Sequence, residues 1–350
     1  MAETLTAQQR ANLFAMSTRQ NLQMMAKQKV TDVNTSMTFT LPRARYLSNI
    51  FVKVAATINA KHATLTNLTV DKLSMYNLVR RWSLDLNNGF MPWAISGAGA
   101  CALNMIQSNA DMLFANSDYC NIPSTLTSSA AGTDNKVVFT VQLPVTLNQR
   151  DPVGLILLQT ENMVADLRVD VGTLSDVFPD ATGYTLTLKD VECVPMLETF
   201  SVPASDDAKP DLSVLKLCSD RVDTITGSGQ QIIKLSTGTI YRKLLLYITD
   251  ENGKPVSPDF VTSTIDLVFN EADCNYRVEP AMLRAKNAYD LGCDIPKGLF
   301  IFDLSNQGTP NLGGMRDYID TEKLSEFWVR FNTNGKGKVR IISETLARLV

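Results

Sequence analysis

The chain contains few of the residues on which most enzymes and metalloproteins depend. Its 350 residues include a single histidine, His62. This excludes most Ser-His-Asp and Cys-His mechanisms and metal sites built from several histidines. The phosphate-binding pattern G-x-x-x-x-G-K-[ST] is also absent, since Gly253 and Lys254 are followed by Pro255. We therefore expect a non-enzymatic protein with no catalytic residues, no metal and no cofactor, in which His62 lies in a surface turn.

Cysteine is sparse and scattered. None of the six cysteines forms a C-x-x-C pair, and a zinc site needs clustered Cys and His ligands. This pattern predicts free thiols in a protein made in a reducing cytoplasm. The six residues are Cys101, Cys120, Cys193, Cys218, Cys274 and Cys293.

Positive charge is not in excess either. The formal net charge is -3, whereas a protein that wraps nucleic acid needs a clear surplus of Lys and Arg. We therefore expect no direct sequence-specific contact with nucleic acid. The first thirty residues lack the apolar segment of a signal peptide, and no run of about 18 apolar residues occurs, so we expect no secretion and no membrane span.

The positive signal is an alternation of apolar and polar residues with period two, which is typical of strands with one buried face. Asn-Gly pairs at 88–89, 252–253 and 334–335 predict tight hairpin turns. In the first half the predicted strands cover 33–41, 50–58, 78–86, 137–147, 155–158, 165–171 and 184–194. In the second half they cover 232–235, 244–249, 265–269, 299–304, 327–331 and 339–342.

The order of elements suggests a duplication. A chain of this length exceeds the usual size of a single hydrophobic core, so two domains are expected. Each half has one predicted helix before an apolar strand, over 103–114 in the first half and starting at Pro280 in the second. The stretch 195–210 contains three prolines and predicts a boundary. These features together predict an all-β protein of two β-sandwiches in tandem.

The N-terminal segment has a different character. Thr6 and Gln9 have the spacing of a capping box, and 7–29 contains neither Gly nor Pro, which predicts a helix. Residues 1–31 contain four cationic side chains and only one acidic side chain, Glu3. The apolar residues of this segment are spread around the helical wheel. We expect this arm to contact either a membrane surface or only neighbouring subunits. The candidate contact residues are Arg10, Leu13, Phe14, Arg19, Met24, Met25, Lys27 and Lys29.

Three classes of function remain open at this point. They are a self-assembling structural protein, a receptor- or carbohydrate-binding sandwich module, and a β-sandwich hydrolase. Missing catalytic motifs disfavour the hydrolase. An exposed aromatic cluster would favour the binding module, but Trp82, Trp93 and Trp328 are far apart in sequence. The polar N-terminal arm favours self-assembly, because ordering it in a monomer would cost roughly 1–2 kcal/mol per residue in backbone entropy.

Four stretches carry a family resemblance. They are TAQQRANLFAMSTRQNLQ, FVKVAATINAKHATLTNLTVDKLSMYNLVRR, TIYRKLLLYITDENG and DIPKGLFIFD, in this order along the chain. With them the chain resembles the major capsid protein of tectiviruses, tailless bacteriophages that hold a membrane inside an icosahedral shell. The resemblance implies an arm at 1–31, a first jelly roll at 32–200, a linker at 201–210 and a second jelly roll at 211–350.

The same resemblance implies the function and the partners. The chain would form a homotrimer, a near-hexagonal tile of an icosahedral shell around an internal membrane and a DNA genome. Its partners would be neighbouring trimers, vertex and minor capsid proteins, and the internal membrane through the arm. It would reside in the virion after assembly in the bacterial host cytoplasm. The alternative is a β-sandwich virion protein that binds a receptor or carbohydrate.

Overall fold

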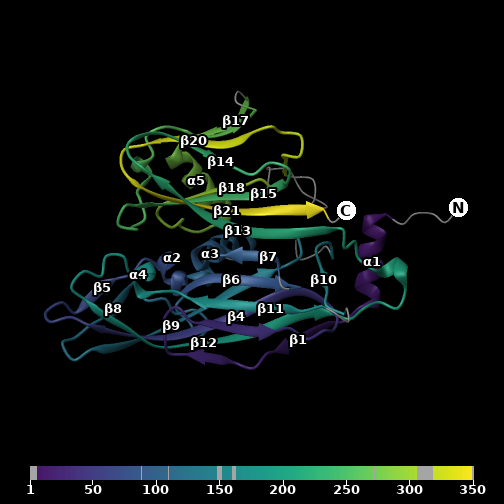
Figure 1. Ribbon diagram of the computed structural model, residues 1–350, viewed down its shortest axis with the longest axis horizontal. Coiled ribbons are helices and arrows are strands. Elements are labelled where there is room, and N and C mark those ends of the chain that lie inside the picture. Colours follow the sequence, from purple (N-terminus) through teal and green to yellow (C-terminus); the bar gives the residue numbers. More distant parts are fainter. Residues whose placement is uncertain are drawn as a thin grey trace.

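The chain folds into two β-sandwiches stacked on one another (Figure 1). The computed structural model describes residues 6–348 except 88, 109, 148–151, 160–162, 271–272 and 306–317. Glu3, Asn88 of the first predicted hairpin turn and the extreme C-terminus therefore lie outside the described residues. Each sandwich encloses its own large apolar core, as the alternating strand pattern predicts.

The second sandwich has the winding of a jelly roll, because successive strands pass between its two sheets. A helix, α5 (Pro280–Leu291), connects β17 to β18. One sheet has the order β13 (Val214–Ile225), β21 (Gly337–Arg348), β15 (Ile240–Asp250) and β18 (Leu299–Asp303), with the short β19 (Ile319–Asp320) beside β15. The other has the order β14 (Gly229–Lys234), β20 (Phe327–Thr333), β16 (Ile265–Phe269) and β17 (Asp273–Val278).

The first sandwich repeats this winding, and its helix α3 (Gly97–Gln107) connects β7 to the β8–β9 region. One sheet has the order β1 (Gln20–Met24), β12 (Thr185–Phe200) and β4 (Tyr46–Lys61), with β9 (Thr133–Pro144) and β10 (Ile156–Leu157) on β4 and β2 (Gln28–Val30) on β12. The other has the order β3 (Ser36–Thr40), β11 (Ala165–Val171), β6 (Val79–Leu86) and β7 (Phe90–Ile95). The strand order of both halves confirms the predicted fold class of two jelly-roll sandwiches in tandem.

Short elements complete the described chain. They are α1 (Ala7–Ser17), α2 (Lys72–Met75), α4 (Leu174–Val177), β5 (Asn67–Thr69) paired with β8 (Thr125–Thr127), and the 3-10 turns η1 (Tyr76–Leu78), η2 (Ala110–Leu113), η3 (Asp206–Ala208) and η4 (Pro258–Phe260). α1 lies at the end of the molecule opposite β5 and β8 (Figure 1).

The two sandwiches share one sheet. β13 of the second sandwich lies parallel to β7 of the first, with Cys218 beside Trp93 and Ser219 beside Ala94. This contact joins the sheets of both halves into a nine-stranded sheet that runs from one sandwich into the other. Among the named strands of the described residues it is the one parallel pairing, beside the isolated parallel bridge of Lys61 with Ser129, and the alternation of residues in the sequence did not indicate it.

A buried asparagine marks the same position in both halves. Asn104 is the eighth residue of α3, and Asn287 is the eighth residue of α5. The Asn104 amide donates to the carbonyl oxygen of Gln142 in β9 at 2.8 Å and accepts from the N–H of Gln142 at 2.8 Å. Asn287 makes the same pair of bonds with Ile301 in β18, at 2.9 and 3.1 Å. The predicted duplication therefore extends to the hydrogen bonds that hold each helix.

The N-terminal segment corrects the sequence prediction. The capping box of Thr6 and Gln9 is present, but the helix predicted over 7–29 ends at Ser17. Residues 20–24 and 28–30 are strands that pair with β12, so the first jelly roll does not start at residue 32. Backbone pairing with an available sheet edge outweighs the helical tendency of this segment, because propensity is a weak prior against tertiary contacts.

Two further details differ from the sequence predictions. β12 continues through Pro195 to Phe200, so the stretch 195–210 is not all connector. Pro195 lacks an N–H, and it lies opposite the break between β1 and β2, where its carbonyl accepts from Met25. The predicted hairpin at 334–335 is also wrong, since β20 and β21 belong to opposite sheets.

The repeated asparagines generate a first prediction. Asn287→Ala should lower the free energy of unfolding by about 2–4 kcal/mol, because it leaves the buried N–H and C=O of Ile301 without partners. Urea denaturation measures this change. Lys286→Ala, one residue earlier and exposed, is the matched control and should change stability by less than about 0.5 kcal/mol. Equal effects of the two substitutions would contradict the role assigned to Asn287.

Candidate functional site

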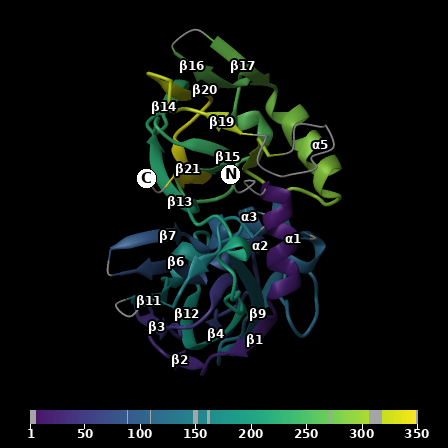
Figure 2. The ribbon, with the colours of Figure 1, turned by 90° about the vertical axis from the view of Figure 1, so that its right-hand side faces the viewer.

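The interface between the two sandwiches is built around α3, which lies between them (Figures 1 and 2). Small residues at the start of this helix permit close approach. A Cβ on Gly97 would lie 1.8 Å from the carbonyl oxygen of Tyr76, so only glycine fits there. Gly97 of the sequence GAGA is therefore a packing requirement.

A polar anchor holds the N-terminal end of α3 to the second sandwich. Ser96 caps the helix, and both its N–H and its hydroxyl donate to the carboxylate of Asp220 in β13. Arg340 of β21 donates to the same carboxylate at 2.7 Å. Asp220 thereby links the helix of one sandwich to two strands of the other.

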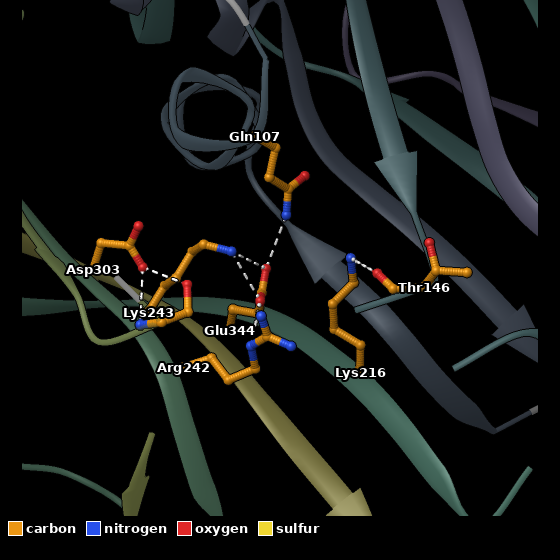
Figure 3. Close-up of polar contacts among 8 residues, drawn as sticks. Gln107, Thr146, Lys216, Arg242, Lys243, Asp303 and Glu344 are labelled. Carbon is orange, nitrogen blue, oxygen red and sulfur yellow. Dashed lines mark hydrogen bonds and ion pairs between the residues drawn. The ribbon is translucent and has the colours of Figure 1, made fainter. Parts of the chain in front are cut away.

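A second anchor lies at the C-terminal end of α3, where half-buried Gln107 meets a group of buried charged side chains (Figure 3). Gln107 donates from Nε2 to the Glu344 carboxylate at 2.9 Å. Lys243 donates to both oxygens of Glu344, at 3.0 and 3.1 Å, and the guanidinium of Arg242 lies 3.5 Å away. A third cation, Lys216, donates to the carbonyl oxygen of Thr146 at 2.8 Å. One carboxylate and three cations are thus shielded from water together.

The neighbouring cations keep the Glu344 carboxyl group ionised. Burial alone would raise the pKa of Glu344, but Lys243, Lys216 and Arg242 outweigh burial and lower it to about 2. Burial lowers the pKa of Lys216, and Glu344 partly offsets this. Lys216 also lies 5.6 Å from the centre of the Trp93 ring, a cation–π contact across the two sandwiches. A buried ion pair of this kind gives positional specificity more than net stability.

Sequence reasoning missed this cluster. Its members lie on strands β13, β15 and β21 and on helix α3, which are far apart in the chain. One signal was present: Arg242 and Lys243 interrupt the apolar run of β15, and both are buried. Charges inside an apolar strand indicate a buried partner, but the partner cannot be identified without the fold.

The candidate residues of the N-terminal arm divide into two groups. Phe14 is buried and makes edge-to-face contacts with Tyr46 and Phe200, at ring distances of 6.0 and 5.5 Å. Lys27 pairs with Glu192 at 3.0 Å, and Lys29 pairs with Asp190 at 2.9 Å.

Met25 is half-buried and packs against the first core. The side chains of Arg10, Leu13, Arg19 and Met24 are exposed. The structure therefore leaves half of the predicted set available for contacts outside the chain.

The other residues singled out in the sequence have local roles. His62 is half-buried, and its Nδ1 accepts from the N–H groups of Thr64 and Leu65 at 3.1 and 2.8 Å. All six cysteines are free thiols, and burial raises the pKa of Cys193 and of Cys218 to about 12. Trp82 and Trp93 are completely buried.

The described part of the chain offers neither a metal-binding cluster nor a membrane-spanning helix. No group of three or more His, Cys, Asp or Glu residues there is placed to hold a metal ion. Among the described helices, none has the length and apolar character needed to cross a bilayer.

The geometry defines a double jelly-roll protein in which two equivalent sandwiches share a continuous sheet. Solved structures similar to this chain include viral major capsid proteins. The STIV major capsid protein has a TM-score of 0.70 at 13% identity, over 94% of this chain and 97% of that chain. PBCV-1 Vp54 has a TM-score of 0.60 at 9% identity, over 95% of both chains.

A phage protein has the same fold. The major capsid protein P2 from bacteriophage PM2 has a TM-score of 0.53 at 8% identity, over 95% of this chain and 98% of that chain. No protein-family model and no curated protein sequence matches the chain. At these identities the likeness shows the fold, over nearly the whole length of each protein.

The charge cluster generates a prediction about pH. Because the pKa of Glu344 is depressed in the folded state, its stabilising effect is complete above its ordinary value of 4.5 and is lost as the pH falls toward about 2. Glu344→Gln should lower the free energy of unfolding at pH 7 by about 3–5 kcal/mol, since three buried cations lose their counter-charge. Urea denaturation of both proteins between pH 7 and pH 2.5 should show this difference shrinking. A difference that is independent of pH would contradict the assignment.

The docking of α1 generates another prediction. Phe14→Ala should release the helix and make residues 6–18 sensitive to protease, because packing against Tyr46 and Phe200 worth roughly 3 kcal/mol is lost. Met16→Ala is the control, since Met16 is 79% exposed on the same helix. Limited proteolysis followed by mass spectrometry distinguishes the two. Equal cleavage of both variants would show that Phe14 does not hold the helix.

Proposed function

We propose that this protein is a non-enzymatic major capsid protein that forms homotrimers and tiles an icosahedral shell. The observation that carries this proposal is the double jelly-roll winding, shared end to end with three viral major capsid proteins. Two equivalent sandwiches in one chain let three copies present six similar walls. Repeated copies of one chain then build a closed shell with few kinds of contact.

The finer assignment is to a tectivirus-like phage with a DNA genome and a membrane inside the shell. The sequence resemblance and the structural likeness to the PM2 phage protein support it. The partners would be neighbouring trimers, vertex and minor capsid proteins, and the internal membrane. The protein would assemble in the bacterial host cytoplasm and reside in the virion, without reading a nucleic-acid sequence. A receptor- or carbohydrate-binding role receives no support from the two buried tryptophans.

Trimer formation is directly measurable. Multi-angle light scattering at micromolar concentration should give three times 38.6 kDa. An interface that keeps such a tile together typically buries more than about 2,000 Å² and persists at this concentration. Negative-stain images should show near-hexagonal particles. A monomer at micromolar concentration in both measurements would refute the proposal.

The membrane contact has its own test. Lys27 and Lys29 are neutralised by Glu192 and Asp190, so the segment relies on Arg10 and Arg19 for attraction to anionic lipid. Each contributes roughly 1 kcal/mol near such a surface. Replacing both arginines with Gln should weaken binding to phosphatidylserine vesicles at low salt by roughly tenfold or more. Replacing Lys27 and Lys29 with Gln should leave binding nearly unchanged, and the opposite ranking would contradict this contact.

A further inference from the structure

The two strands that join the sandwiches of one chain have counterparts elsewhere in the molecule. Within the chain, the first strand of the second jelly roll, β13, lies parallel to β7, the strand that precedes the helix of the first. The corresponding strands elsewhere in the molecule are β1, the first strand of the first jelly roll, and β17, which precedes α5. Among the described strands, β1 and β17 each form the edge of their sheet.

The two halves can be aligned through their strand registers. Asn104 binds Gln142 as Asn287 binds Ile301, so these two strand residues are equivalent. Across the first sheet, Gln142 is followed by Phe51, Met196 and Met24. Across the second sheet, Ile301 is followed by Leu245, Ile342 and Asp220. Met24 therefore occupies the position of Asp220, and Leu22 that of Cys218.

The other edge aligns in the same way. Ser96 and Glu279 are the N-cap residues of α3 and α5, which places Tyr276 at the position of Trp93 and Arg277 at that of Ala94. The neighbouring strands agree, since Leu84 pairs with Trp93 as Leu267 pairs with Tyr276.

One residue type recurs at the contact itself. Glu198 pairs with Leu22 as Glu344 pairs with Cys218, so the strands next to β1 and β13 carry a glutamate at the same place. Glu344 accepts from Lys243, and Glu198 accepts at 3.3 Å from Asn49, which occupies the equivalent position.

The residues of the intrachain contact are buried, whereas the equivalent residues at the β1 edge are exposed. Cys218 and Trp93 are buried, whereas Leu22 is 57% and Met24 is 68% exposed on β1. The outer face of α5 shows the same contrast. Tyr289 is 89% exposed, whereas Ile106, at the equivalent place in α3, is half-buried and packs against the large apolar core. Apolar side chains are thus uncovered where the internal contact covers their equivalents.

The two open edges lie at opposite ends of the stacked sandwiches, β17 at the top and β1 at the bottom (Figures 1 and 2). A contact between opposite ends of identical molecules is heterologous, and it produces a closed ring when the rotation between copies permits. Strand addition to an exposed sheet edge is a common recognition mode, because backbone hydrogen bonds supply the affinity. The intrachain sheet would then continue from one copy into the next.

We propose that β1 of one copy lies parallel to β17 of a second copy, with Leu22 beside Tyr276 and Gln23 beside Arg277. The second copy thereby repeats the contact of β13 with β7. The proposal rests on the trimer of the proposed function and adds the residues that form its interface.

A disulfide cross-link tests this register. Gln23 and Arg277 are both exposed, so Gln23→Cys with Arg277→Cys should fold, and adjacent strands bring Cα atoms within disulfide range. Cys274→Ser removes the native thiol on β17. Mild oxidation should link most chains into dimers and trimers on a non-reducing gel. Mixing isotope-labelled and unlabelled copies should show that the link joins positions 23 and 277 of different chains.

The matched control places the second cysteine on the other edge of the same sheet. Lys234 in β14 is more exposed than Arg277, at 72% against 59%, yet Lys234→Cys with Gln23→Cys should give less than a tenth of the cross-linked product. If light scattering shows a trimer but positions 23 and 277 do not link, or link no better than the control, the register is wrong and the proposed function stands. A monomer at micromolar concentration would overturn both.

A charge substitution gives a second readout. Leu22→Arg should shift the trimer toward monomers by at least tenfold in dissociation constant, because it places an unpaired charge at the edge of β1. Ile232→Arg, at 49% exposure on β14, is the control and should leave the trimer intact. Equal behaviour of the two variants would remove β1 from the interface.

Discussion

Burial of α3 between the two sandwiches is the constraint on which the rest of the structure depends. The helix fits only because Gly97 lets its backbone approach Tyr76. Its two ends are then tied by polar contacts, to Asp220 at one end and to Glu344 at the other. Removing either contact would take a hydrogen bond from a buried carboxylate, and leaving such a group less satisfied costs more than the bond contributes when it is made. The two sandwiches therefore have one relative position.

The same constraint explains why the two halves differ although they share a winding. α3 is buried from Gly97 to Met105 and carries mostly small or apolar residues, whereas α5 keeps one face outside and carries Lys286 and Tyr289 there. The helices keep one feature in common, the asparagine that binds the following strand. Each jelly roll forms this bond within itself, so the bond is present in both halves. The surroundings of the two helices differ.

The N-terminal segment belongs partly to the body of the protein. Its strands complete the first jelly roll, and Phe14 holds α1 against the place where β12 ends. Two of its four cations are used in ion pairs with β12. What remains for outside contacts is a shorter, less charged surface than the composition of the segment suggests. A jelly roll that lacked residues 20–30 would lack its first strand, so the segment is not a detachable arm.

The sequence by itself determined the class of fold. Period-two alternation at 137–147 and 165–171, Pro280 at a helix start and the repeated order of elements were sufficient, because each is a local pattern that burial of one strand face imposes. Only the tertiary structure decided the fate of residues 20–30, since an open edge of β12 competes with helix formation and local propensity cannot report that edge.

The partners of Lys216, Lys243 and Glu344, and the parallel contact at Cys218, were likewise decided by tertiary structure alone. Each depends on strands separated by long stretches of chain, and their pairing is set by how the two sandwiches pack. Local patterns specify the faces of the strands, and packing specifies which faces meet.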